Sequence, residues 1–152
     1  MKLAEALALR ADRQRYLAQL KSRLLANAKV QEGDTPAEDP EALLNELEQV
    51  TGELERLIQR INRTNAATVL EPGVTVTDAL AIRDMLQTKQ GIYRELGQAA
   101  SVIQSRLTRS EVKFRSAVDV AAAHQTANDL ARQFRELDVR IQEKNWLTEL
   151  VD

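Results

Sequence analysis

The sequence contains no cysteine among its 152 residues. This absence excludes disulfide bonds, thiolate catalysis and zinc sites with thiolate ligands. Aromatic residues are also rare, because the only ones are Tyr16, Tyr93, Phe114, Phe134 and Trp146. Leucine and alanine therefore supply most of the apolar side chains, and both residue types favour helix.

Glycine, proline and histidine are scarce as well, with five, three and one residues. So few helix breakers predict long helices. A single histidine, His124, gives no basis for a Ser–His–acid triad or for the Glu-x-x-His pair of di-iron bundles. The sequence has no glycine-rich phosphate loop, and its acidic pairs at metal-binding spacing lie only in a loop and at the terminus. These absences argue against an enzyme and predict no metal and no cofactor.

The chain also lacks an excess of basic residues and any long apolar run. Its formal charge is −2 and its pI is near 5.6, which argues against nucleic acid as a partner, because such binding needs a basic face. No run approaches the roughly 18 apolar residues of a membrane span. The first residues are too polar for a signal peptide. We therefore expect a cytoplasmic protein without a membrane span.

What the sequence does contain is helical periodicity. Apolar residues recur at alternating steps of three and four in four blocks, at about 2–27, 40–65, 77–107 and 120–148. Such stripes average 3.5 residues per turn, the period of helices that wind around each other, and a narrow stripe is typical of a helix–helix seam. The sequence predicts an all-α fold: one domain over 1–152, an antiparallel bundle of four long helices with coiled-coil-like seams.

Some of these stripes are interrupted by charge. Arg10 and Arg13 interrupt the first, and Lys89 interrupts the third. The third stripe comprises Ala79, Ile82, Leu86, Tyr93, Leu96, Ala100, Ile103 and Leu107. Because charged positions do not all fit a dry four-helix core, we expect part of these faces to contact other subunits. The sequence therefore predicts a homo-oligomer.

The connections carry turn and cap signals. Two short β segments are predicted, at about 68–76 and 111–118, and Pro72-Gly73 suits the centre of a type II turn within the first. We expect the β segments to pair with each other or with another subunit, because an isolated hairpin is marginally stable. The predicted N-caps are Asp39, Thr75 or Thr77, and Asp119.

Polar residues replace the apolar stripe where two helices end. Asn65 follows Ile61 on the second stripe, and Asn145 follows Ile141 on the fourth. If neighbouring helices are antiparallel, these ends meet, and we expect them either to cap helices, to form a pocket for an anion or small ligand, or to form a subunit interface. The ligand-binding or interface candidates are Asn62, Arg63, Thr64, Asn65, Arg83, Asp84, Gln142, Asn145 and Trp146. A second polar group, which includes Asn27 and His124, is interpreted as a solvated rim.

Five stretches resemble one family. They are LRADRQRYLAQLKSRLLANAKVQEGDTPAEDPEALL at 9–44, INRTNAAT at 61–68, TDALAIRDML at 77–86, SEVKF at 110–114 and RELDVRIQEKNW at 135–146. Together they resemble the septicolysin-like proteins, which are small, mostly bacterial helical proteins of uncharacterised function. The resemblance implies a helical fold and makes the candidate residues that lie in these stretches possible site or interface residues. It also implies pore formation, the activity of a cytolysin, as a possible function.

The preferred functional hypothesis is an interaction or scaffold protein that forms homo-oligomers, because helix surfaces are present and a catalytic constellation is not. The first alternative is a small-ligand or anion-binding protein, possibly an enzyme, with a polar site at Asn62, Asn65 and Asn145. The second alternative is a pore-forming cytolysin of the septicolysin type.

Overall fold

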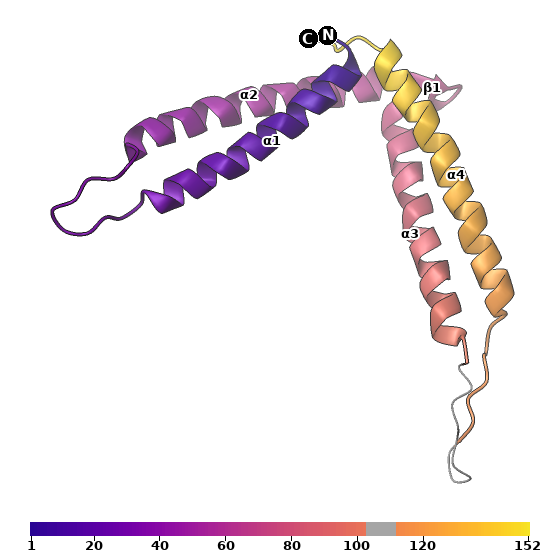
Figure 1. The fold of residues 1–152 in the computed structure, drawn as a ribbon. Coiled ribbons are helices and arrows are strands. Elements are labelled where there is room, and N and C mark those ends of the chain that lie inside the picture. The colour runs from indigo at the N-terminus through magenta and orange to yellow at the C-terminus, as the bar shows by residue number, and fades with distance from the viewer. Residues whose placement is uncertain (103–111) are drawn as a thin grey trace. The chain divides into compact units, whose positions relative to one another are not determined.

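The computed structural model describes residues 1–102 and 112–152, which form four α-helices and one two-stranded antiparallel sheet (Figure 1). The elements are α1 (Leu3–Ala26), α2 (Pro40–Ala67), β1 (Val69–Glu71), β2 (Val74–Thr75), α3 (Val76–Ala100) and α4 (Val120–Leu147). The helices have 24 to 28 residues, so each is about 36–42 Å long. The mostly helical fold and the β segment near 68–76 are confirmed.

Helix starts follow local cap chemistry. The Asp39 carboxylate accepts a hydrogen bond from the Glu41 backbone N–H at 3.0 Å, and a proline occupies the first position of α2. Thr75 and Asp78 form a reciprocal capping box at the start of α3, and Asp119 accepts a bond from the first turn of α4. The hydrogen bonds from Thr75 lower the pKa of Asp78. These three predicted caps are confirmed, with Thr75 as the cap of α3.

Strands β1 and β2 pair with each other across the predicted turn. Gly73 adopts φ +79°, which the third position of a type II turn requires. The second predicted β segment is wrong for residues 112–118, which form no strand; residue 111 lies outside the described residues. An alternating pattern makes a strand only where it pairs with another strand, and residues 112–118 pair with no strand among the described residues.

Contacts divide the chain into two compact units. Unit 1 comprises residues 1–69 and 142–152, and unit 2 comprises residues 70–141. The single domain over 1–152, the four-helix bundle and its coiled-coil seams stay predictions.

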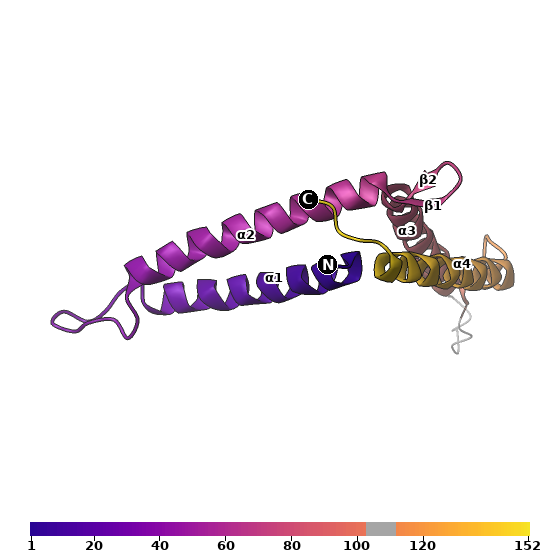
Figure 2. The same ribbon diagram turned by 90° about the horizontal axis from the view of Figure 1, so that it is seen from above.

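In unit 1, α1 and α2 lie side by side and antiparallel (Figures 1 and 2). Arg13 pairs with Glu53 at 3.3 Å, and further along Arg23 approaches Glu46 at 3.9 Å. The segment after α4 joins this pair of helices. The Leu3 N–H donates to the carbonyl of residue 148, and the N–H of residue 150 donates to that of Met1, both at 2.9 Å.

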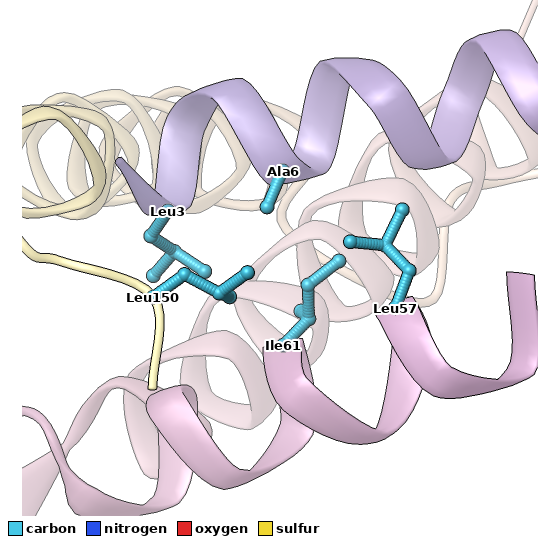
Figure 3. Close-up of a cluster of buried hydrophobic side chains, with 5 residues drawn as sticks. All are labelled: Leu3, Ala6, Leu57, Ile61 and Leu150. Carbon is cyan, nitrogen blue, oxygen red and sulfur yellow. The ribbon is translucent and has the colours of Figure 1, made fainter. Parts of the chain in front are cut away.

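A small apolar core holds these parts of unit 1 together. Figure 3 shows its five buried side chains, Leu3, Ala6, Leu57, Ile61 and Leu150. They come from α1, from α2 and from the segment after α4. The stripe of α2 is therefore buried as its periodicity predicts, with Leu43, Val50 and Leu54 continuing it away from the core cluster.

In unit 2, α3 and α4 are antiparallel. Arg83 pairs with Asp138 at 2.7 Å, and the His124 ring lies over Gly97, where an added Cβ would stand 2.7–3.0 Å from three ring atoms. Arg83 precedes Gly97 by fourteen residues, and His124 precedes Asp138 by the same number. The two helices thus keep one register over two heptads. Accordingly, His124 is a packing residue and not part of a solvated rim.

The third predicted stripe is wrong in part. Ala79 and Gly97 are buried, but Ile82 and Leu96 are exposed. The face of α3 that meets α4 carries Arg83 and Gly97. Each lies one residue after an aliphatic residue of the predicted stripe, Ile82 or Leu96. Ile103 and Leu107 of the predicted stripe lie outside the described residues.

Candidate functional site

The polar end of α2 holds the segment that follows α4. The Thr64 hydroxyl donates to the Arg60 carbonyl at 2.8 Å and accepts from the Val151 N–H at 3.1 Å. Arg60 Nε donates to the Val151 carbonyl at 2.9 Å, and Arg63 donates to the Asp152 carbonyl at 3.3 Å. Thr64 is buried because it forms part of this junction. A polar residue at this stripe position thus serves a backbone segment that an aliphatic side chain could not bind.

Asn145 is the other buried polar residue of this group, with 4% of its surface exposed. Its Oδ1 has no hydrogen-bond partner among the described residues. A buried amide oxygen without a donor costs roughly 1–3 kcal/mol, so such an atom calls for an explanation. Asn65 is half-buried, whereas Asn62, Gln142 and Trp146 are exposed. The structure places all five in unit 1, and no hydrogen bond joins Asn65 to Asn145 among the described residues.

Arg83 and Asp84 are the two candidates in unit 2. Arg83 is neutralised by Asp138 at 2.7 Å and lies 3.6 Å from Asp84. This pairing gives the arginine a structural role between α3 and α4. A second ion pair, between Arg140 and Glu71 at 2.5 Å, links α4 to the hairpin β1–β2.

Sequence reasoning missed two features near the start of α1. Arg10 Nε is buried and has no hydrogen-bond partner in the part of the chain that the structure describes. A pocket of about 290 Å³ between α1 and α2 gathers three arginines, Arg13, Arg56 and Arg60, around the single carboxylate of Glu53. The only sequence signal was the pair of arginines that interrupts the first stripe.

A polar network at the far end of unit 1 was also missed. The Glu38 carboxylate accepts from Arg23 Nη2 at 2.6 Å, and the Tyr16 hydroxyl donates to Glu46. Arg23 lowers the pKa of Glu38, and Glu46 raises the pKa of the Tyr16 hydroxyl. Asn27 is buried, and its side chain accepts from the Glu38 N–H at 3.0 Å. Asn27 therefore anchors the loop after α1 and does not belong to a solvated rim.

An apolar groove of about 630 Å³ runs along α1 and α2. We call it the α1–α2 groove. Four leucines line it, Leu17, Leu24, Leu25 and Leu47, together with Ala18, Gln14 and Lys21. Leu25 is 67% exposed and the nearby Leu44 is 50% exposed. Two helices bury only one seam between them, so this side of the pair stays open.

Unit 2 has an exposed apolar surface of its own. Ile82, Met85, Ile92 and Leu96 form a stripe on α3 that is 39–59% exposed, and we call it the α3 outer stripe. Lys89 stands in its middle. At the end of α3 a pocket of about 480 Å³ continues this surface past Leu96 to Phe114 and Val118. The residues of the stripe are spaced as in a coiled-coil seam.

Residues 1–102 and 112–152 contain no group of three or more His, Asp or Glu side chains that could hold a metal ion. Over the same ranges, no helix combines the length and the apolar character needed to cross a bilayer.

Comparison with known proteins identifies the family of this chain. A model of a family of unknown function, DUF6847, matches residues 10–150. The chain belongs to this family. The DUF6847 chain is also similar to a solved structure described as a functionally unknown conserved protein from Corynebacterium diphtheriae. The two are 45% identical, the match covers 99% of each chain, and the TM-score is 0.93. No curated protein matches.

The expected membership of the septicolysin-like family is wrong, because the matching family model is that of DUF6847 and neither comparison points to a septicolysin. Short helical stretches rich in Leu, Arg and Glu occur in many unrelated helical proteins, so they identify a family poorly. The lytic hypothesis depended on that resemblance and is withdrawn with it. Membership of DUF6847 assigns no activity.

Proposed function

We propose that this protein is an interaction or scaffold protein that assembles as a homo-oligomer. The observation that carries the proposal is the presence of two separate exposed apolar surfaces, the α1–α2 groove in unit 1 and the α3 outer stripe in unit 2. Exposed contiguous apolar surface on a folded protein marks binding sites more often than scattered apolar residues do. A chain with two such surfaces can bind two partners at once, which is what a scaffold requires. Its cytoplasmic location stays a prediction.

The type of surface supports helical partners. Both surfaces follow residues spaced by three and four along a helix, and such stripes bind other helices by interdigitation of side chains. The narrow width of each stripe, with charged residues on its borders, suits one or two helices rather than a sheet.

The test is the mass of the protein in solution. Light scattering at micromolar concentration should give a mass clearly above the 17.1 kDa of one chain. Leu25→Glu in the groove or Ile92→Glu in the outer stripe should lower that mass, because each places a charge in an apolar contact. Gln19→Glu, on an exposed face of α1 away from the groove, is the matched control. A wild-type protein that is strictly monomeric would overturn the proposal.

A second candidate function is the binding of a small ligand or anion at the polar end of α2 and α4. It is supported by one specific observation, the buried Asn145 oxygen for which the described residues provide no hydrogen-bond donor. A ligand that brings an N–H or O–H group would supply the missing donor. Asn62 and Asn65 belong to the same candidate site as outlying polar groups.

Thermal-shift measurements with phosphate, nucleotides, sugars and divalent cations test this candidate, since binding to the native state raises the melting temperature. Asn145→Leu should abolish a shift that the control Gln98→Ala, at an exposed position of α3 outside the candidate site, retains. If none of these compounds shifts the wild-type melting temperature, the second candidate fails.

A further inference from the structure

The α1–α2 groove has charged borders of opposite sign on its two helices. On α1, Lys21 lines the groove beside Leu17 and Leu25. On α2, Glu41, Glu48 and Glu55 repeat every seven residues and are all exposed. Seven residues are two helical turns, so these glutamates form one row on α2. Lys21, Glu41 and Glu48 take part in no ion pair among the described residues, so these charges stay free for a partner.

The row of glutamates alternates with smaller or apolar residues. Leu44, Thr51 and Ile58 stand between and after the glutamates at steps of three and four, so they share the same face of α2. On α1 the corresponding outer face carries Ala4, Leu7, Ala11, Gln14, Ala18, Lys21 and Leu25, also at steps of three and four. Small alanines opposite long glutamates leave room for two such faces to approach closely.

The ion pairs within unit 1 show which residues of α1 and α2 lie at the same level, that is, at the same height along the axis of the helix pair. Arg13 lies opposite Glu53, and Arg23 lies opposite Glu46. Lys21 is therefore level with the part of α2 between residues 45 and 48. Rotation about a two-fold axis parallel to the helices leaves levels unchanged and lays α1 of a second copy antiparallel on α2 of the first.

We infer that the α1–α2 groove is occupied by the same groove of a second copy, in a four-helix dimer whose two-fold axis runs parallel to the helices. Lys21 of each copy then lies between Glu41 and Glu48 of the other. This arrangement covers the exposed leucines of both copies. It also pairs the lysine of each groove with the glutamates of the other copy's groove. The inference rests on the proposed self-association and names the surface and the contacts by which it occurs.

Charge reversal tests the arrangement on the full-length chain. Lys21→Glu or Glu48→Lys alone should raise the dissociation constant of the dimer roughly tenfold or more, because each places like charges together at two symmetry-related contacts. The double variant should return to within a few-fold of the wild type. Gln19→Glu, which changes the charge of α1 away from the groove, should leave the dissociation constant unchanged. Sedimentation velocity gives these constants.

Mixing the two single variants shows whether the contact is between chains. In a mixed dimer, every contact between positions 21 and 48 pairs opposite charges, whereas in each parent dimer both contacts repel. Native mass spectrometry of an equimolar mixture should therefore show mixed dimers well above the share that random pairing gives. Circular dichroism of each variant verifies that the helices are intact.

The outcomes separate this inference from the proposed function. Wild-type dimers that tolerate both reversals, or that pair at random when mixed, would overturn the groove arrangement and leave assembly through the α3 outer stripe standing. A wild-type chain that stays monomeric would overturn both. Dimers that are weakened by Lys21→Glu but not rescued by Glu48→Lys would also contradict the stated contacts.

Discussion

Gly97 and His124 show how one small residue determines the packing of two helices. In most helix interiors alanine is more stable than glycine by about 0.5–1 kcal/mol. At position 97 a Cβ would stand 2.7 Å from His124 Cε1 and 3.0 Å from both ring nitrogens. The imidazole therefore packs on the bare backbone of α3, and this pair forms one of the contacts between α3 and α4.

Gly97→Ala should therefore fail to give the stabilisation of about 0.5–1 kcal/mol that alanine normally brings to a helix, because the ring must move away from the added Cβ. In a His124→Ala background the same change should raise the free energy of unfolding by about 0.5–1 kcal/mol. Urea denaturation of the four proteins measures the coupling. Gly91→Ala, where nothing lies within 4 Å of the added Cβ, is the control and should stabilise. Equal stabilisation by Gly97→Ala in both backgrounds would contradict this account.

At the scale of elements, the loop between α1 and α2 is attached by the contacts of Glu38. Its carboxylate binds Arg23, and its backbone N–H binds Asn27 at the end of α1. The same arginine approaches Glu46 on α2. Glu38 thus attaches the loop to α1, and Arg23 connects this contact to α2, although neither residue belongs to an apolar stripe.

This attachment predicts a dependence on pH. Arg23 holds the pKa of Glu38 below its ordinary value in the folded state. The stabilisation is therefore fully present above the pKa of an unfolded glutamate, about 4.3, and is lost as the pH falls through the lower folded value. Glu38→Gln should weaken the fold at neutral pH and make its further loss of stability between about pH 6 and 3 smaller than in the wild type.

Chemical denaturation across that pH range measures the effect. Asp78 and Glu149, whose pKa values are also lowered by their partners, keep part of the acid sensitivity in the variant. Glu32→Gln, in the same loop but without an ion pair within residues 1–102 and 112–152, should retain the wild-type profile. If Glu38→Gln and the wild type lose stability in parallel, the ion pair with Arg23 does not contribute.

At the scale of the whole molecule, the two ends of the chain belong to one unit. Leu150 is buried among Leu3, Ala6, Leu57 and Ile61 (Figure 3). The Thr64 hydroxyl and the Arg60 guanidinium bind the backbone beside it. A short segment at the end of the chain thereby completes the core that α2 forms with α1, a helix that begins 147 residues earlier at Leu3.

Leu150→Ala should lower the free energy of unfolding of unit 1 by about 2–4 kcal/mol through the cavity it leaves. Hydrogen exchange should show faster opening at the amides of Leu3 and Ile61. Val151→Ala, at the neighbouring but exposed position, should change stability by less than about 0.5 kcal/mol. Leu150→Ala with an effect as small as that of Val151→Ala would show that the segment does not stabilise the core.

The sequence by itself determined where α1, α2 and α4 lie and where α3 begins, but α3 ends at Ala100 and not near residue 107 as predicted. The stripe of α2, the caps at Asp39 and Thr75, and the turn at Pro72-Gly73 could all be predicted, because periodicity, capping and turn geometry depend on residues within a few positions of each other. Periodicity also placed Asn145 at a buried position. These signals are local, so they can be recognised without knowing which distant residues pack against them.

Only the tertiary structure decided which face of a helix is used and which distant residues meet. On α3, one stripe through Ala79 and Arg83 and another through Ile82 and Met85 both have helical spacing, and the position of α4 selects the first. The pairing of Arg23 with Glu38 and the burial of Leu150 have no local signature either. Contacts between residues far apart in the sequence depend on how the elements pack, and no short window of sequence contains that information.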